Sequence, residues 1–357
     1  MPSTTSQPVA PSATSAPRGS APAQLALTGE VAYVAGQDPQ IFLLDLSTGE
    51  SRQLTELRPE HAELADTEPM RLVLSCGFGP TELSWSPDGS LLAFSYGSCD
   101  AVVYVVDLEG TLRRVGEGRS PDWSPDGRTL IFSPNSPFCA RADCGDPPAP
   151  GAWNLQVVDV TTGSDPRPLS LHEAARNGGQ PAYSPDGKLI AYTGLLPDAA
   201  ADPELFAATY VIGADGTDPR LVARGAWPSA WLPDNRLLLV DERTGDLRAL
   251  DLATTDAVAL GGDASFVTAS PDGTRLLLVS TDTATGASRT RMASLDGETL
   301  AETPGYPAAW APDSSAAVLI DPAGMLAIVD RDGAAAATYE LPDAFNLFPP
   351  AAWRPGS

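Results

Sequence analysis

The two histidines of the chain are the side chains best suited to acid–base or metal chemistry. His61 is flanked by Glu60 and Glu63, and His172 is followed by Glu173. Imidazole and carboxylate groups close together can exchange protons or bind a cation. The competing interpretation is two solvated loop histidines, because the two lie in segments far apart in the sequence. Both histidines are candidate ligand-binding residues.

Asp122 and Trp227 are two further candidates for ligand binding. Asp122 comes directly before the first residue of a motif that recurs along the chain, an aromatic residue followed by Ser-Pro-Asp-Gly or a variant of it. The other copies have a small residue at this position: Ser84, Ala182, Ala230, Thr268, Ala309 and Ala352. A carboxylate at such a position needs a partner. Asp122 therefore either lines a cation or ligand site or accepts a hydrogen bond from a neighbouring strand. Trp227 is either a stacking platform for a sugar or peptide or a packed corner residue.

Motifs for catalysis and for metal binding are weak in this chain. The Gly-x-Ser-x-Gly motif of a nucleophile elbow does not occur, and no catalytic residue is assigned. The segments 215–218 and 330–333 resemble fragments of calcium-binding loops, but each lacks the full set of oxygen ligands. We interpret both as turns.

The recurring motif consists of an aromatic residue followed by Ser-Pro-Asp-Gly. It occurs at 85–89, 123–127 and 183–187, with weaker copies at 231–235, 269–273 and 310–314 and a fragment at 353–356. Proline and aspartate suit the central positions of a type I turn, and glycine suits the left-handed residue that follows in a bulged hairpin. Asn235 can replace that glycine, whereas Ser314 is a poorer substitute, so a variant turn is expected there. The aromatic residue is expected to pack between neighbouring repeats.

The spacing of the repeats predicts the fold. Consecutive repeat prolines are separated by 38, 60, 48, 38, 41 and 43 residues. A period of about 40 residues with strand-rich content is typical of β-propeller blades. An apolar strand such as 91–96 follows each turn, and the next strand often ends in aspartate, as in 102–107. This pattern resembles the TolB-type, WD-repeat-like β-propeller family over residues 29–356. The resemblance implies a propeller and leaves the activity open, because propellers host many functions.

The two ends of the chain are expected to share one blade. Residues 29–57 carry three strands that correspond to the second, third and fourth strands of a blade, and residues 351–353 carry the missing first strand. We therefore predict an all-β, seven-bladed β-propeller closed by pairing of the C-terminal strand with the N-terminal blade. Residues 1–24 are rich in Pro, Ser, Thr and Ala and are expected to form a disordered linker, which leaves 25–357 as the propeller.

Antiparallel pairing divides the loops of each blade between two faces. The repeat turns and the third-to-fourth turns share one face, and the second-to-third loops and the links between blades share the other. The long insertions 57–80, 133–152, 170–180 and 194–207 all fall on the second face. Loops of this length are often functional. This insertion face is therefore expected to bind a protein or a small ligand.

The four cysteines also fall on the insertion face. Cys76 lies in the link that enters a blade and Cys99 in the second-to-third loop of that blade, while Cys139 and Cys144 share the next long loop. This topology favours the disulfides Cys76–Cys99 and Cys139–Cys144, which would indicate an oxidising compartment. The alternative is a metal site, because Cys139 and Cys144 have loose ligand spacing, but no histidine lies near them in sequence.

Composition limits the partners and the location. The formal net charge of −24 disfavours nucleic acid and anionic membrane surfaces. Solubility explains this charge most simply, and attraction of cations or basic partners is the alternative. No run of about 20 apolar residues predicts a membrane span. The N-terminal linker and the cysteines favour an extracytoplasmic location, periplasmic or at the cell surface, with an export signal or lipid anchor in a longer precursor.

Two functions are compatible with these features. The first is an exported, non-catalytic binding or scaffold propeller, monomeric and without a cofactor, that uses its insertion face for protein or small-ligand recognition. The second is a metal-dependent propeller hydrolase, lactonase- or phytase-like, with carboxylates at the central channel and calcium as its cofactor. Asp122 is the one candidate for such a carboxylate, and one is too few. The binding function is therefore favoured.

Overall fold

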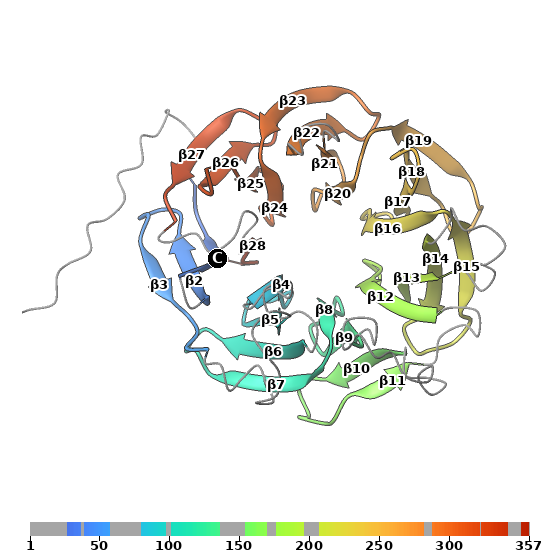
Figure 1. The fold of residues 1–357 in the computed structure, drawn as a ribbon, viewed down its shortest axis with the longest axis horizontal. Helices are drawn as coiled ribbons and strands as arrows, with labels where there is room; N and C mark the ends of the chain where they lie inside the picture. The colour runs from blue at the N-terminus through green and yellow to red at the C-terminus, as the bar shows by residue number, and fades with distance from the viewer. Residues whose placement is uncertain are drawn as a thin grey trace, which may run out of the picture.

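Seven four-stranded antiparallel sheets stand in a ring around a central axis (Figure 1). The structure is a computed structural model that describes residues 27–36, 39–57, 80–97, 101–135, 154–169, 176–195, 207–281, 288–321, 323–341 and 351–356. Every regular element in these ranges is a strand. The predicted all-β, seven-bladed propeller is confirmed, and residues 1–24 lie outside the described ranges.

The blades are numbered here along the ring, with strands given from the axis outward. Blade 1 contains β28 (Ala351–Trp353), β1 (Glu30–Ala35), β2 (Gln40–Asp45) and β3 (Ser51–Gln53). Blade 2 contains β4 (Pro80–Trp85), β5 (Leu91–Tyr96), β6 (Val102–Asp107) and β7 (Leu112–Glu117). Blade 3 contains β8 (Arg119–Trp123), β9 (Thr129–Ser133), β10 (Leu155–Asp159) and β11 (Arg167–Leu169).

The other four blades follow the same order without a break. Blade 4 contains β12 (Arg176–Tyr183), β13 (Leu189–Leu195), β14 (Ala207–Gly213) and β15 (Arg220–Arg224). Blade 5 contains β16 (Ala226–Trp231), β17 (Leu237–Asp241), β18 (Leu247–Leu250) and β19 (Ala257–Gly261). Blade 6 contains β20 (Phe266–Ala269), β21 (Arg275–Thr281), β22 (Ser288–Ser294) and β23 (Thr299–Pro304). Blade 7 contains β24 (Tyr306–Trp310), β25 (Ala316–Ile320), β26 (Leu326–Asp330) and β27 (Ala335–Tyr339).

The Ser-Pro-Asp-Gly turn is held together by its own side chains. Ser86 Oγ donates to Asp88 Oδ1 (2.6 Å) and accepts from the Leu91 N–H (3.0 Å), while the Gly89 N–H donates to Ser86 O (2.8 Å). Gly89 has φ +68°, a conformation that glycine adopts without steric cost. The same bonds recur in the turns that begin at Ser124, Ser184 and Ser270.

The turn that contains Ser314 has the same geometry, so the expected variant turn is wrong. Ser314 has φ +63° and its N–H donates to Ala311 O (2.9 Å), as glycine does elsewhere. Its hydroxyl accepts a hydrogen bond from the Asp272 N–H (2.9 Å) in the preceding blade. Asn235 accepts from the Asp186 N–H in the same way (3.2 Å). These bonds between blades offset the cost of a left-handed conformation in a residue with a side chain.

The repeat tryptophans join consecutive blades, as predicted. The indole Nε1 of Trp123 donates to Ser84 O (3.0 Å), and that of Trp231 donates to Ala182 O (3.0 Å). Each acceptor lies one residue before the repeat aromatic of the preceding blade. Trp310 is buried at the same position, and within the described ranges its Nε1 has no hydrogen-bond partner. The indole thus contributes apolar packing in every blade that carries it and a polar bond in some of them.

The C-terminal strand closes the ring as predicted. β28 pairs with β1 in the register Val31↔Trp353, Ala32↔Ala352 and Tyr33↔Ala351. Ala351 and Trp353 pack in the apolar cluster between blades 7 and 1, and Ala352 packs in the cluster between blades 1 and 2. Successive side chains of a strand point to opposite faces of the sheet, so this short strand packs against both neighbouring blades.

Side chains of the last residues tie this closing strand to the first two blades. Arg354 forms an ion pair with Glu30, and its Nε donates to Gly89 O (2.8 Å). Trp85 Nε1 donates to Ala352 O (3.2 Å). These contacts attach the closing segment to β1 and to the first repeat turn.

The two calcium-like fragments are turns, as interpreted from the sequence. Asp215 Oδ1 accepts the N–H and the hydroxyl of Thr217 (3.0 and 2.6 Å). Asp330 Oδ1 accepts the N–H groups of Asp332 and Ala334 (2.9 and 2.8 Å). An aspartate at the end of the third strand, or two residues after it, therefore stabilises the turn, which gives part of the acidic charge a structural role.

Candidate functional site

Strand direction separates two faces of the ring. The repeat turns and the third-to-fourth turns lie on one face, here called the turn face, and the opposite face is the insertion face. β9 ends at Ser133 and β10 begins at Leu155, so the long segment between them starts and ends on the insertion face. The same holds for the segments between β13 and β14, between β3 and β4, and between β11 and β12. The predicted placement of these insertions at one face is confirmed for the ends that the structure describes.

Six of the residues proposed from the sequence lie outside the described residues. They are His61, His172, Cys76, Cys99, Cys139 and Cys144. Their predicted roles, ligand binding for the histidines and disulfides for the cysteines, stay predictions.

Three aromatic residues occupy one register at the insertion-face ends of three consecutive innermost strands. Trp227 in β16 pairs with Val240, Phe266 in β20 pairs with Val279, and Tyr306 in β24 pairs with Ile320. In each blade, one residue of the second strand pairs with the repeat aromatic position. The partner of Trp227, Phe266 or Tyr306 lies three residues after it on the same strand. The three residues, here called the aromatic arc, therefore stand at corresponding places in blades 5, 6 and 7.

The aromatic arc is packed yet open to solvent. The Phe266 and Tyr306 rings stack with centroids 6.1 Å apart and an interplanar angle of 23°, and Phe266 is 40% exposed. Trp227 is half-buried against the apolar cluster between blades 5 and 6. Ser229 Oγ donates to Val267 O (2.7 Å) and accepts from the Val267 N–H (3.0 Å), which fixes β16 against β20. An exposed aromatic held in this way is preorganised for stacking on a ligand.

Polar residues with strained backbone stand at the same end of the innermost strands in blades 2, 3 and 4. Glu82, Ser120 and Gln180 have φ values of +55°, +53° and +47°, and each lies at a register shift between the first and second strands. Glu82 accepts hydrogen bonds from the N–H and the hydroxyl of Ser120 (2.6 and 2.8 Å). Left-handed residues other than glycine are costly and cluster at functional sites. These three residues are called the polar arc.

The insertion-face end of the innermost strands is therefore divided into two halves. Blades 5 to 7 contribute the aromatic arc and blades 2 to 4 contribute the polar arc, in which Glu82 and Gln180 are exposed. The innermost strands surround the ring axis in Figure 1, with blade 1 between the two halves on one side. We call this region the axial rim. Its two halves suit a ligand that is apolar on one side and hydrogen-bonding on the other.

Sequence reasoning identified Trp227 but missed Phe266 and Tyr306. Trp227 and Tyr306 both lie four residues before the repeat aromatic, so the spacing alone could have paired them. Phe266 lies three residues before Ala269 because β20 lacks the bulge that adds one residue to β16 and β24. A bulge is a pairing feature, and it becomes visible only when the partner strand is known.

Asp122 bonds to the neighbouring blade. Its Oδ2 accepts a hydrogen bond from the Tyr183 N–H (2.8 Å) in β12, which matches the simpler of the two sequence interpretations. Burial raises the pKa of Asp122 to about 6, against the lowering effect of the N–H groups of Tyr183 and Trp123. Burial, and then the charge of Asp122, raises the pKa of the Tyr183 hydroxyl. A ligand-binding role for Asp122 stays a prediction.

Asp122 is expected to make folding stability depend on pH. Its pKa is higher in the folded chain than in the unfolded chain, so the folded state holds the proton more tightly. The stabilisation is present at low pH and is lost as the pH rises from about 4 through 6. Between about pH 5 and pH 8 the loss should be on the order of 1 kcal/mol. Urea unfolding of the wild type and of Asp122→Asn at both pH values measures this difference.

The asparagine variant can accept the same hydrogen bond without titrating, and all other groups contribute equally to both proteins. The stability of Asp122→Asn relative to the wild type should therefore increase with pH. An unchanged difference between the two proteins across this range would contradict the raised pKa.

Comparison with known proteins shows likeness in fold alone. No protein-family model and no curated protein sequence matches the chain. Oligogalacturonate lyase from Vibrio parahaemolyticus aligns with a TM-score of 0.58 and 15% identity over 89% of this chain and 88% of the lyase chain. TolB from Acinetobacter baumannii aligns with a TM-score of 0.50 and 15% identity over 92% of this chain and 67% of TolB. Hydrazine synthase from Kuenenia stuttgartiensis aligns with a TM-score of 0.51 and 16% identity over 76% and 80%.

The part of the chain that the structure describes contains no helix with the length and hydrophobicity needed to cross a bilayer.

The repeat turns, the seven sheets and the alignment with TolB agree on one architecture. The chain has the fold of a TolB-like, seven-bladed β-propeller.

Proposed function

We propose that this protein is an exported, non-catalytic binding propeller whose axial rim receives a segment of a protein partner. The observation that carries the proposal is the division of the rim into an aromatic arc and a polar arc on the face that also bears the long insertions. An extended segment or loop that enters the rim can stack an apolar side chain on Phe266 and offer hydrogen-bond donors to Glu82. The acidic net charge of −24 favours a partner segment that carries basic groups.

An extracytoplasmic location forms part of this proposal. Its support is the N-terminal stretch rich in Pro, Ser, Thr and Ala and the four cysteines, which the sequence predicts to lie on the insertion face. Such cysteines would stabilise the long loops as disulfides in an oxidising compartment.

The hydrolase alternative gains no support from the residues that the structure describes. Asp122 is engaged with the Tyr183 N–H, and no three His, Cys, Asp or Glu side chains in the described ranges are grouped so that they could hold a metal ion. The likeness to oligogalacturonate lyase is a likeness in fold at 15% identity, so it does not favour a catalytic function.

Selection of peptides from a random library on the purified wild-type protein tests the binding site. Peptides that bind the rim should carry an apolar or aromatic residue together with a basic residue. Their affinity should fall roughly tenfold for Phe266→Ala, because loss of a central aromatic contact costs about 1.4 kcal/mol or more. Isothermal titration calorimetry with the selected peptides measures the change.

Val258→Ala is the matched control, because Val258 is another large exposed apolar side chain (53%) and lies on the outermost strand β19. Peptides should bind this variant as they bind the wild type. Peptides that tolerate Phe266→Ala, or that lose affinity equally for both variants, would contradict the proposed site.

A further inference from the structure

A cavity of about 350 Å³ lies on the turn face between blades 3 and 4. Asp126, Val157 and Arg167 line it from blade 3, and Tyr183 and Ala214 line it from blade 4. The volume falls within the range of small-ligand sites. The cavity is on the face opposite to the axial rim, so the function proposed above does not explain it.

The repeat aromatic at this junction is a tyrosine where most blades have a tryptophan. In blades 2, 3 and 5 the indole extends to a backbone carbonyl of the preceding blade. Tyr183 has a smaller ring system and no indole N–H to make this bond, and its hydroxyl makes no hydrogen bond with any residue that the structure describes. The hydroxyl belongs to the lining of the cavity, since Tyr183 is one of its lining residues.

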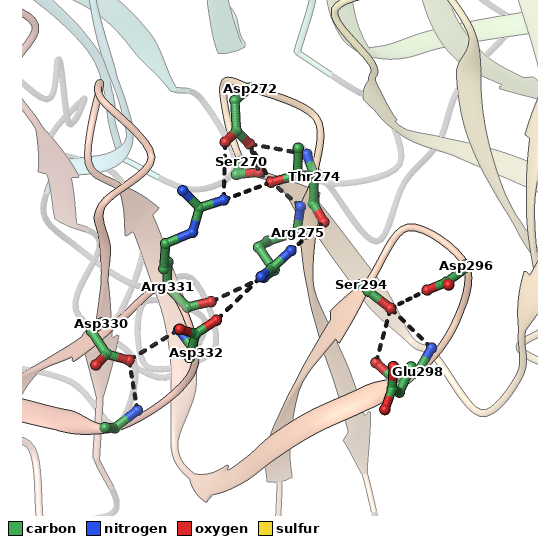
Figure 2. Close-up of polar contacts among 11 residues, drawn as sticks. Ser270, Asp272, Thr274, Arg275, Ser294, Asp296, Glu298, Asp330, Arg331 and Asp332 are labelled. Atoms are coloured by element: carbon green, nitrogen blue, oxygen red, sulfur yellow. Dashed lines mark hydrogen bonds and ion pairs between the residues drawn. The ribbon is translucent and has the colours of Figure 1, made fainter.

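A small residue just after the third strand leaves further space at the same junction, because Ala214 stands where blades 1 and 3 have Leu46 and Val160. Between blades 6 and 7 the corresponding place is filled by Arg331, whose Nη2 pairs with Asp272 Oδ2 (3.4 Å), as Figure 2 shows. The Arg331 N–H donates to Ser315 O (3.0 Å), and the equivalent bond in blade 4 joins the Ala214 N–H to Lys188 O (2.9 Å). Ala214 therefore occupies the position of Arg331 with a side chain too small to reach across the junction.

Two opposite charges that line the cavity, Asp126 and Arg167, are exposed to solvent and unpaired with each other, whereas a third charged lining residue, Asp186, pairs with Lys188 (3.0 Å). Asp126 corresponds to Asp272, and its Oδ1 accepts hydrogen bonds from the Ser124 hydroxyl (2.6 Å) and the Arg128 N–H (3.1 Å). These bonds hold the pKa of Asp126 below its usual value, so the carboxylate is ionised at neutral pH. Asp126 Oδ2 and the Arg167 guanidinium form no ion pair with each other or with another residue in the described ranges, although both groups line one cavity.

We propose that this cavity binds a small zwitterion, a molecule with one cationic nitrogen and one carboxylate. The carboxylate of the ligand pairs with Arg167, its cationic nitrogen pairs with Asp126, and its aliphatic part rests against Val157 and Ala214. An anion can pair with Arg167 alone and a simple cation with Asp126 alone, whereas a zwitterion can pair with both. An α-amino acid and a betaine share this chemistry.

Calorimetric titration of the full chain with L-valine, L-proline and glycine betaine tests the proposal. At least one of these should bind saturably at millimolar concentration. Valine methyl ester, which lacks the carboxylate, and isovalerate, which lacks the nitrogen, should each bind roughly 10- to 100-fold more weakly than valine. Binding of betaine alone would identify the quaternary nitrogen as the recognised group, and binding of the amino acids alone would identify the primary or secondary ammonium.

Two pairs of variants separate the cavity from general effects on folding. Asp126→Asn should weaken binding roughly tenfold or more, whereas Asp272→Asn, the same change at the corresponding turn of blade 6, should leave it unchanged. Ala214→Arg should abolish binding, because the new guanidinium can pair with Asp126 as Arg331 pairs with Asp272. Ala214→Ser is its matched control, and it should bind like the wild type.

Several results would overturn the proposal. These are the absence of saturable binding by all three zwitterions, equal binding of valine and its methyl ester, and unchanged binding by Ala214→Arg. Binding of glucose in preference to every zwitterion would assign the cavity to a polyhydroxylated ligand and would likewise overturn it. Peptide binding at the axial rim should be unaffected by these variants, so failure here leaves the rim proposal to its own test.

Discussion

Removal of the chain from Ala351 onward should abolish cooperative folding of the ring. β28 is the innermost strand of blade 1, and without it β1 exposes an unpaired edge. The buried Trp353 side chain is lost together with Ala351 and Ala352, which pack against blades 7 and 2 respectively. Loss of one buried tryptophan costs about 3–5 kcal/mol, against a total stability of about 5–15 kcal/mol for a typical domain.

Thermal melts followed by far-ultraviolet circular dichroism and by tryptophan fluorescence measure this effect. The truncated chain should unfold over a broad range at a much lower temperature, with transitions that differ between the two probes. Trp353→Phe keeps the closing strand and a large aromatic ring, so it should unfold cooperatively. A truncated chain with the midpoint and cooperativity of the full chain would show that the closing strand is dispensable.

Gly89→Ala should destabilise the ring more than the same change in the next repeat. Gly89 has φ +68°, and a Cβ placed on it would lie 2.2 Å from Pro355 O in the closing segment. Gly127 has φ +70°, but its Cβ would lie 3.5 Å from the nearest atom, in Pro87. Both variants force alanine into the left-handed region, at about 1–2 kcal/mol. Gly89→Ala must also displace backbone, so we expect about 3 kcal/mol or more.

Urea unfolding of the two glycine variants measures the difference directly. Gly356→Ala provides a second control, because its φ is +72° and a Cβ there would meet nothing within 4 Å. Gly356→Ala and Gly127→Ala should cost similar amounts. If Gly89→Ala costs no more than these two, the closing segment does not sit tightly against the first repeat turn.

The fold was readable from the sequence because its signals are local and repeated. Ser86, Asp88 and Gly89 form a turn through bonds within six residues, and the same bonds recur in other blades. The period of the turns then determines the number of sheets. Even the closure by residues 351–353 followed from counting strands, because a blade that lacks its first strand needs one from elsewhere.

The expected variant turn at Ser314 was wrong for a physical reason that lies outside the turn. The hydroxyl of Ser314 accepts the Asp272 N–H of the preceding blade, and this bond supports a conformation that serine alone disfavours. The conformational propensity of serine describes the residue in isolation, whereas a contact between blades determines the backbone conformation of Ser314.

The sequence by itself determined the architecture, the two faces and the position of the insertions, since each depends on turn chemistry and strand alternation close together in the chain. Tertiary structure alone decided which side chains meet across junctions. Phe266 joins Tyr306 because one bulge is missing, and Asp126 lacks the partner that Asp272 finds in Arg331 because Ala214 is short. The pairing of residues from different repeats is set by register and packing, which no single repeat encodes.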